Sequence, residues 1–287
     1  MKRILSMILA ALLLCGSIGC VVISHVTKYA NADKYTAGGF TYEASAVKRV
    51  ELEWAAGDVT LVNGNGTLSV SESGGDTLSQ SERLHWWLDG TTLRIKYCES
   101  GFSHVIQAKK KHLTLELPTE NRVDLKIDIA SGAIGADSLY VQTLDVNTAS
   151  GGMQIDRMLD AEEVKIDSAS GGIHFGAVTV DTKFTVDTAS GGLTVDRINA
   201  KTVKIESASG GVTLGLDTAD TVNIDAASGK ILLKLADPAR GATVSLQKVS
   251  GTFDCKLPMT AEGKSYKIGG GEIRIDIDAV SGSITIE

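Results

Sequence analysis

The chain has 287 residues, of which 31 are glycine and only 3 are proline. This composition excludes a collagen-like or proline-rich chain, while a hydrophobic share of 43% is sufficient for a folded core. A formal net charge of −7 excludes nucleic acid as the main partner, because the chain has no surplus of cations to replace phosphate counterions.

Residues 1–23 have the pattern of a secretory signal peptide or a membrane anchor. Lys2 and Arg3 precede an uncharged apolar run that ends at Ser24 and is just long enough to span a bilayer. The stretch Gly-Ser-Ile-Gly-Cys at its end also resembles the lipobox of bacterial lipoproteins, in which Cys20 would carry the lipid. Lipoprotein and uncleaved anchor stay open as alternatives. Both place the rest of the chain outside the cytoplasm.

Residues 24–46 are polar and weakly patterned, and we expect them to form a tether that lifts the following domain off the membrane. Beyond the first segment, Cys98 and Cys255 lie 157 residues apart and show no metal-ligand spacing. An extracytoplasmic setting permits a disulfide between them. The alternative is that both are isolated, small apolar residues in strands.

Residues 47–120 contain short runs of alternating apolar and polar residues, separated by Asn-Gly and Asp-Gly turn signals. We interpret them as irregular coils that cap one end of a repetitive structure, because an open stack exposes a strand edge and a core. The lysine run at 109–111 is interpreted as a solvated hairpin, with contact to membrane lipid as the alternative. We expect the tryptophans to fill the cap, an exposed aromatic platform being the alternative; they are Trp54, Trp86 and Trp87.

Residues 121–287 repeat a Ser-Gly pair with a period near 20. Each period carries two short runs in which apolar residues alternate with polar ones, the pattern of strands with one buried face. Two strands per period predict an all-β, single-domain β-solenoid over residues 47–287, and the longest interval is expected to contain an inserted hairpin around Pro258. The pair begins at Ser131, Ser150, Ser170, Ser190, Ser209, Ser228, Ser250 and Ser281.

The Ser-Gly pairs are interpreted as structural turns. Glycine permits a positive φ that other residues avoid, and serine hydroxyls hydrogen-bond the backbone in tight turns. A serine repeated in every coil is not a nucleophile, because a nucleophile needs a positioned base. The turn residues singled out are Ser150, Gly151, Ser170, Gly171, Ser190, Gly191, Ser209 and Gly210.

A column of carboxylates precedes the turns by three residues. If the register holds, successive members lie near 5 Å apart and repel one another modestly. One interpretation is a solvated edge relieved by Lys165 and Lys204; the other is a ladder of cations such as Ca²⁺ bridged by carboxylate oxygens. The column contains Asp167, Asp187, Glu206 and Asp225. The sequence predicts no resident metal, cofactor or catalytic residue.

Three motifs together resemble the bacterial "putative adhesin" domains, also called toast-rack β-solenoids. They are Gly-Asp-Val-Thr-Leu at 57–61, Leu-Glu-Leu-Pro at 115–118, and the Ser-Gly turns through Ser281. The resemblance covers residues 47–287. It implies a membrane-tethered, extracytoplasmic solenoid associated with adhesion and sometimes with envelope-stress systems, and it carries over no catalytic residue.

These observations predict a non-enzymatic, membrane-tethered protein that acts outside the cytoplasm as an adhesin or binds another component of the cell envelope. Its expected partner is an envelope component or a membrane protein. A sensor or regulatory subunit of an envelope-stress system is the alternative. A polysaccharide-acting β-helix enzyme is a further alternative, but the outward residues of the first strands form no catalytic cluster, and His174 is the only histidine in the regular coils.

Overall fold

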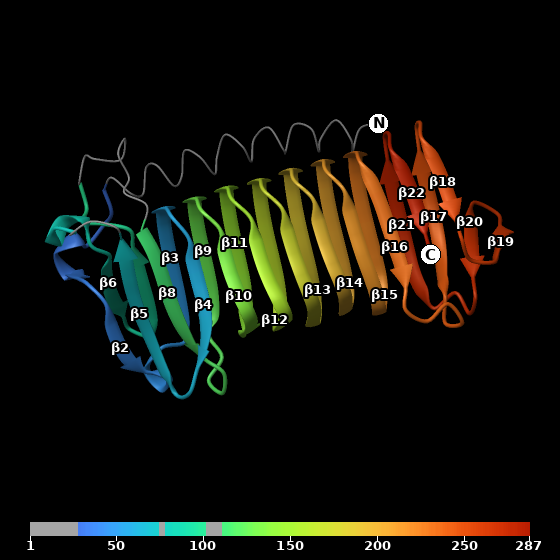
Figure 1. Cartoon of the computed structure of the whole chain (residues 1–287). Helices are drawn as coiled ribbons and strands as arrows, with labels where there is room; N and C mark the ends of the chain where they lie inside the picture. The colour runs from blue at the N-terminus through green and yellow to red at the C-terminus, as the bar shows by residue number, and fades with distance from the viewer. Residues whose placement is uncertain (1–27, 75–77, 102–110) are drawn as a thin grey trace.

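The repeated alternation of apolar and polar residues folds into coils that stack into one elongated parallel β-solenoid (Figure 1). A computed structural model describes residues 28–74, 78–101 and 111–287. The predicted membrane segment at 1–23, with Cys20, lies outside these residues. Among the described residues, no helix is long and apolar enough to span a bilayer.

The regular coils pair in parallel and in register, so that Val164, Phe184 and Val203 lie side by side on successive coils. The two runs of each period, predicted as separate strands, join in the four central coils into one strand of 17 or 18 residues that bends at a register shift. The strands are β9 (Asp124–Ser131), β10 (Ile134–Tyr140), β11 (Thr143–Ser150), β12 (Met153–Ser170), β13 (Ile173–Ser190), β14 (Leu193–Ser209), β15 (Val212–Ser228) and β16 (Lys230–Leu235).

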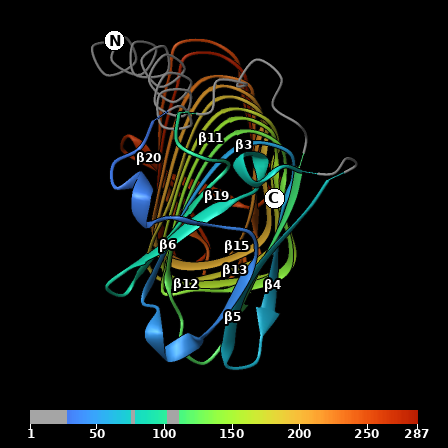
Figure 2. The same ribbon diagram turned by 90° about the vertical axis from the view of Figure 1, so that its left-hand side faces the viewer.

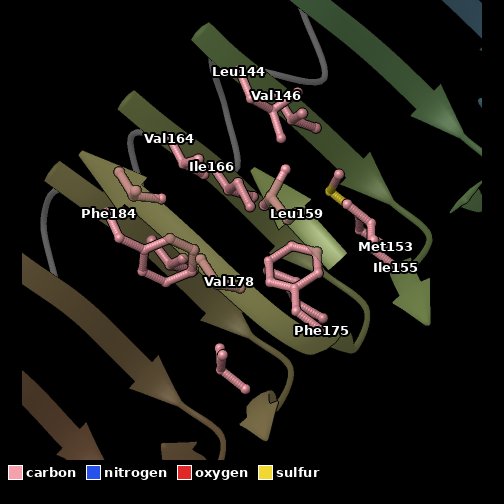
Figure 3. Close-up of a cluster of buried hydrophobic side chains, with 14 of the residues drawn as sticks. Leu144, Val146, Met153, Ile155, Leu159, Val164, Ile166, Phe175, Val178 and Phe184 are labelled. Carbon is pink, nitrogen blue, oxygen red and sulfur yellow. The ribbon is translucent and has the colours of Figure 1, made fainter. Parts of the chain in front are cut away.

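The core is a narrow column between the two arms of each coil. Figure 3 shows Val164 and Phe184 from one arm directed toward Ile155 and Phe175 from the other. Phe175 and Phe184 are fully buried and meet edge to face, with ring centroids 6.2 Å apart. Because every second residue of a strand points inward, the alternation in the sequence alone determines which side chains fill this column.

At the amino-terminal end, the order of the coils in space differs from their order in sequence. The coil made by β3 (Arg49–Ala56) and β4 (Val59–Gly64) stacks directly on β9 and β10. The later coil of β7 (Thr92–Lys96) and β8 (Lys111–Pro118) lies outside it. Antiparallel strands β5 (Thr67–Gly74) and β6 (His85–Asp89) cross this end, as Figure 2 shows along the stack. This end therefore combines parallel coils with antiparallel strands, unlike the regular part of the stack.

The tether expected at 24–46 is wrong for its described part, residues 28–46. Strand β1 (Thr36–Ala37) pairs with β6, and β2 (Phe40–Glu43) pairs with β5. Tyr29 donates a hydrogen bond from its hydroxyl to the Cys98 carbonyl at 3.1 Å. These strands are too short for an alternating pattern to appear in the sequence. The short 3₁₀ helices of the cap are Ala32–Lys34, Ala44–Ala46 and Gln80–Glu82.

The carboxy-terminal end repeats the exchange of order. The last coil in sequence, β21 (Ile273–Ala279) and β22 (Ser283–Ile286), lies against β15 and β16. The earlier coil of β17 (Ala242–Lys248) and β18 (Thr252–Cys255) stacks outside it. The hairpin expected in the longest interval is present as β19 (Met259–Glu262) and β20 (Ser265–Ile268), and β20 pairs antiparallel with β17.

Candidate functional site: a groove floored by glycine

The first glycine of each Ser-Gly turn is required by the stacking of the coils. Gly171 has a φ of +117°, which side chains disfavour. A Cβ at this position would lie 2.1 Å from the Gly151 carbonyl oxygen of the preceding coil. Gly151, Gly191 and Gly210 repeat both features. This column is therefore part of the scaffold.

The serines lie at the same corner, and several donate along the stack. Ser170 donates to the Ala149 carbonyl at 3.2 Å, and Ser250 donates to the Val280 carbonyl at 3.2 Å. Ser150, Ser190 and Ser209 occupy the same place in their own coils. A hydroxyl that donates to the backbone of the neighbouring coil supports stacking and is not activated as a nucleophile.

The second glycine after the serine is not required by its backbone conformation. Four successive coils have glycine here, although none of these residues has a positive φ. A Cβ on Gly172 would meet open space, and one on Gly192 would make an ordinary contact at 3.7 Å. Other coils carry side chains at this position, including Asp58 and Lys230. The four glycines are Gly152, Gly172, Gly192 and Gly211. Stacking does not explain glycine at the last three, whereas a Cβ on Gly152 would lie 2.8 Å from the Gly172 carbonyl oxygen.

The surface over three of these glycines is hollowed into a groove of about 440 Å³ that runs from coil to coil. Its floor is backbone, because the neighbouring Met153 and Ile173 bury their side chains in the core. Gln154, His174 and Thr194 form one rim. The full lining is Ala133, Ile134, Gly152, Met153, Gln154, Gly172, Ile173, His174, Gly192 and Thr194.

The floor presents a row of unused hydrogen-bond donors. The amide of Met153 donates to the Gly172 carbonyl at 3.0 Å, and Ile173 donates to Gly192 at 2.8 Å. The amides of the four second glycines, in contrast, form no hydrogen bond within the described part of the chain. Since the coils repeat every ~4.8 Å, these N–H groups form a row at that spacing.

One coil shows what such an amide binds. Ala133 occupies the second-glycine position in its coil, and its N–H donates to Asp58 Oδ1 at 2.9 Å. Asp58 holds the same position in the preceding coil, so its carboxylate reaches across one coil spacing. From Gly152 onward the preceding residue is alanine or glycine, which supplies no acceptor. The unpaired amides along the groove could therefore donate to an oxygen acceptor from outside the chain.

The rim adds side chains that both donate and accept hydrogen bonds. Gln154 donates to Asp156 Oδ1 at 2.6 Å, and His174 Nε2 lies 3.4 Å from Asp196 Oδ2. His174 is 44% exposed. Of the residues that line the groove, none is a serine, a cysteine or a carboxylate. The lining therefore supports binding through hydrogen bonds.

The carboxylate column lies on the other arm of the coils, and its members align in register. Lys165 pairs with Asp167 and Lys204 pairs with Glu206, both within their own coils. Among the described residues, no group of three His, Cys, Asp or Glu side chains is arranged to hold a metal ion. Two of the four carboxylates in the column are therefore paired with lysine.

Asp187 differs from its neighbours because Thr185 stands where they have lysine. Burial, together with repulsion from Glu206 and Asp167, raises the pKa of Asp187 to about 6. The folded state therefore binds this proton more tightly than the unfolded chain does. The resulting stabilisation is complete below about pH 4 and is lost as the pH rises through 6.

Replacing Asp187 with asparagine is expected to raise the free energy of unfolding at pH 7 by about 2 kcal/mol. At pH 4 the variant and the parent should be nearly equal, because the parent carboxyl is then largely protonated. Denaturant unfolding at a series of pH values measures the difference. Asp160→Asn is the control, because Asp160 pairs with Arg122 away from the carboxylate column, and its loss should give no gain. An Asp187→Asn gain that is the same at both pH values would contradict the prediction.

The remaining predicted residues fall in the end caps. Cys98 is buried, Cys255 is half-buried, and both are free thiols, so the disulfide alternative is not present. Trp54 is fully buried, and Trp86 packs against Phe40 with ring centroids 4.2 Å apart, as expected for side chains that fill the cap. The solvated interpretation of the lysine run is wrong at Lys111, which is 1% exposed.

A row of parallel coils with glycine turns defines the class of this protein as a β-solenoid. The family model for Toastrack DUF4097 matches residues 47–287, and the chain belongs to this family. None of the curated proteins compared with the chain is similar to it.

A solved structure with a TM-score above 0.5 shows the same fold at low sequence identity. A crystal structure described as a putative adhesin from Bacteroides fragilis has a TM-score of 0.52 and 12% identity, covering 87% of this chain and 96% of that one. A putative adhesin from Parabacteroides distasonis has a TM-score of 0.43 and 9% identity, covering 88% and 97% of the two chains. The first of these likenesses supports the fold alone.

Proposed function

We propose that the chain is a non-enzymatic binding protein of the bacterial cell envelope, an adhesin-like solenoid that holds an extended glycan in the groove over Gly152, Gly172 and Gly192. In this proposal residues 1–23 anchor the chain to the membrane and the solenoid lies outside the cytoplasm. The adhesin descriptions of the structural relatives are consistent with a surface role.

The row of free amides carries the proposal. Each free N–H on the groove floor faces alanine or glycine at the same position of the preceding coil, which supplies no acceptor. The first amide of the series, that of Ala133, is bound by the Asp58 carboxylate. A ligand oxygen placed like Asp58 Oδ1 in each following coil would satisfy the row. Hydroxyl and carboxylate oxygens of a sugar chain provide such acceptors.

The spacing of the row favours a sugar chain over a peptide. An extended peptide rises 3.2–3.4 Å per residue, so its acceptors fall out of step with donors repeating at ~4.8 Å. A chain of pyranose rings repeats at a length close to the coil spacing. The amide, imidazole and hydroxyl on the rim, Gln154, His174 and Thr194, are side chains that exchange hydrogen bonds with sugar hydroxyls.

The same lining supports a binding role over a catalytic one. Glycoside hydrolysis requires two carboxyl groups flanking the scissile bond. Two carboxylates beside the rim are engaged by rim side chains: Asp156 accepts from Gln154, and Asp196 lies beside His174. The turn serines donate to backbone carbonyls.

A substitution that copies the arrangement at Asp58 tests the groove. Gly172→Asp places a carboxylate at the turn position that Asp58 holds in its own coil, so it should bind the Gly192 amide and occupy the groove without disturbing the stack. We expect it to weaken binding of an oligogalacturonate at least tenfold, measured by calorimetry on the full chain in detergent micelles. Asp58→Ala frees the Ala133 amide, lengthens the row and should tighten binding.

Thr252→Asp is the matched control, because it changes the same turn position outside the groove and should leave binding unchanged. A neutral β-glucan oligomer tested in parallel distinguishes hydroxyl from carboxylate recognition. Binding of either oligomer that is lost in Gly172→Asp supports the proposal. Absence of binding to both, or equal affinity in the parent and Gly172→Asp, would contradict it.

A further inference from the structure

We propose that the free edge of β18 pairs with the same edge of a second copy of this chain, antiparallel and about a two-fold axis at Cys255. The solenoid would then form end-to-end dimers through its carboxy-terminal coil. This inference is independent of the groove, because the two surfaces share no residue.

The edge of β18 is open. At this end, β20 covers the outer side of β17, but in the described structure β18 pairs with β22 alone. The amides of Thr252 and Lys256 donate toward β22, to Gly282 at 3.1 Å and Ile286 at 2.8 Å. Because backbone groups alternate along a strand, those of Phe253 and Cys255 point away from β22 and toward the open side.

Apolar side chains gather at the same end without complete cover. Phe253, Cys255 and Leu257 pack against the core but stay half-buried. Among the described residues, three large hydrophobic side chains are exposed, and two of them lie here: Val249 is 70% exposed and Met259 is 44% exposed. A second copy seated on the edge would bury apolar surface that water now contacts.

The charges of the edge are self-complementary. With the two-fold axis at Cys255, Asp254 of each copy lies opposite Lys256 of the other, and Phe253 lies opposite Leu257. Asp254 and Lys256 are 54% and 58% exposed and form an ion pair with each other within one chain, which the second copy would replace with two pairs across the axis. Shifting the axis to Asp254 would place two carboxylates directly opposite, which is destabilising.

The backbone agrees with this register. In an antiparallel pair, residues that exchange hydrogen bonds alternate with residues that do not. Cys255 would exchange bonds with its counterpart, using the groups that point to the open side. Pro258 would face Thr252 at a position that requires no N–H, so the proline does not interrupt the pairing. Charged residues and proline also protect edges from pairing, and Asp254 and Lys256 already pair within one strand. In the proposed register their opposite charges also match across the axis.

Charge reversal on the full chain in detergent micelles tests the pairing. Asp254→Lys alone and Lys256→Asp alone each place like charges opposite across the axis, and each should raise the dimer dissociation constant about tenfold. The exchange Asp254→Lys with Lys256→Asp restores both pairs with inverted sign. It should recover the dissociation constant of the parent, measured by analytical ultracentrifugation over a concentration series.

Cross-linking gives an independent reading of the register. In a chain whose other cysteines, Cys15, Cys20 and Cys98, are replaced by serine, mild oxidation should join two chains through Cys255. A matched chain with Cys255→Ser and Thr194→Cys carries its thiol on the groove rim and should stay monomeric. A parent that is monomeric at every concentration, or an exchange variant no tighter than the single reversals, would overturn the proposal.

Discussion

Replacing Gly171 with alanine should lower the free energy of unfolding by about 4 kcal/mol, because the added methyl group meets two obstacles at once. The backbone at Gly171 has a φ of +117°, where a Cβ is strained. The same Cβ would lie 2.1 Å from the Gly151 carbonyl oxygen, so the coils must move apart to admit it. Equilibrium unfolding in denaturant measures the loss.

Gly172→Ala is a control that differs by one position. A Cβ on Gly172 meets open space, and its backbone lies outside the positive-φ region, so we expect a change within about 0.5 kcal/mol. Hydrogen exchange should place the Gly171→Ala effect in β12 and β13, since each coil contacts only its neighbours. Equal effects of the two substitutions would show that the backbone at the turn relaxes to admit the methyl group, and would contradict the prediction.

Replacing Lys111 with methionine should destabilise the protein by about 3 kcal/mol. The Lys111 side chain is 1% exposed, and its ammonium group lies 3.0 Å from the carboxylate of Glu72, whose side chain is 7% exposed. It also donates to the carbonyls of Glu82, at 2.7 Å, and Tyr97. Burial lowers the pKa of Lys111, whereas Glu72 opposes that shift. Without the lysine, the Glu72 carboxylate stays buried and has lost its counter-charge.

The double variant Lys111→Met with Glu72→Leu removes both charges and should recover most of the lost stability. Lys234→Met is the matched control, because Lys234 pairs with Glu287 at 3.6 Å on an exposed surface, where such pairs contribute little. Thermal and denaturant unfolding of the parent, Lys111→Met, Glu72→Leu and the double variant measures the cycle, with Lys234→Met beside them. A double variant as unstable as the single one would show that Lys111 acts through its contacts with the carbonyls or the rings of Trp54 and Tyr97.

The regular part of the fold was predictable because one physical rule repeats in every coil. Apolar residues two apart, such as Val164 and Ile166, must face the core, and a glycine in each turn marks the corner. If equivalent residues of successive coils pair with one another, the carboxylates of the column also lie in register. The family resemblance drew on the same motifs, and the family match confirms it.

The ends were not predictable from that rule. A Ser-Gly turn does not encode which neighbour it stacks on, so the exchange of order between β17 and β21 is invisible in the sequence. Short strands such as β2 contain too few residues for an alternation to appear. Lys111 belongs to a lysine run, which usually indicates solvated surface, and only the cap around it reveals the burial.

The groove could not be predicted, because the sequence does not distinguish the two glycines of each turn. Both glycines of a Ser-Gly-Gly turn look alike in the chain, and only the backbone angles separate Gly171, which stacking requires, from Gly172, which it does not. The hydrogen bond from Ala133 to Asp58 joins residues 75 positions apart, so no local pattern announces it.

The exchanged order of the last coils has a mechanical consequence. A force applied to Glu287 acts on β22, which is held on one side by β16 and on the other by β18. Because β22 is hydrogen-bonded on both sides, a force along it loads the hydrogen bonds to both neighbours together. An outermost strand is bonded on one side only, and its hydrogen bonds can break one at a time. The solenoid therefore resists detachment of β22 when force acts at Glu287.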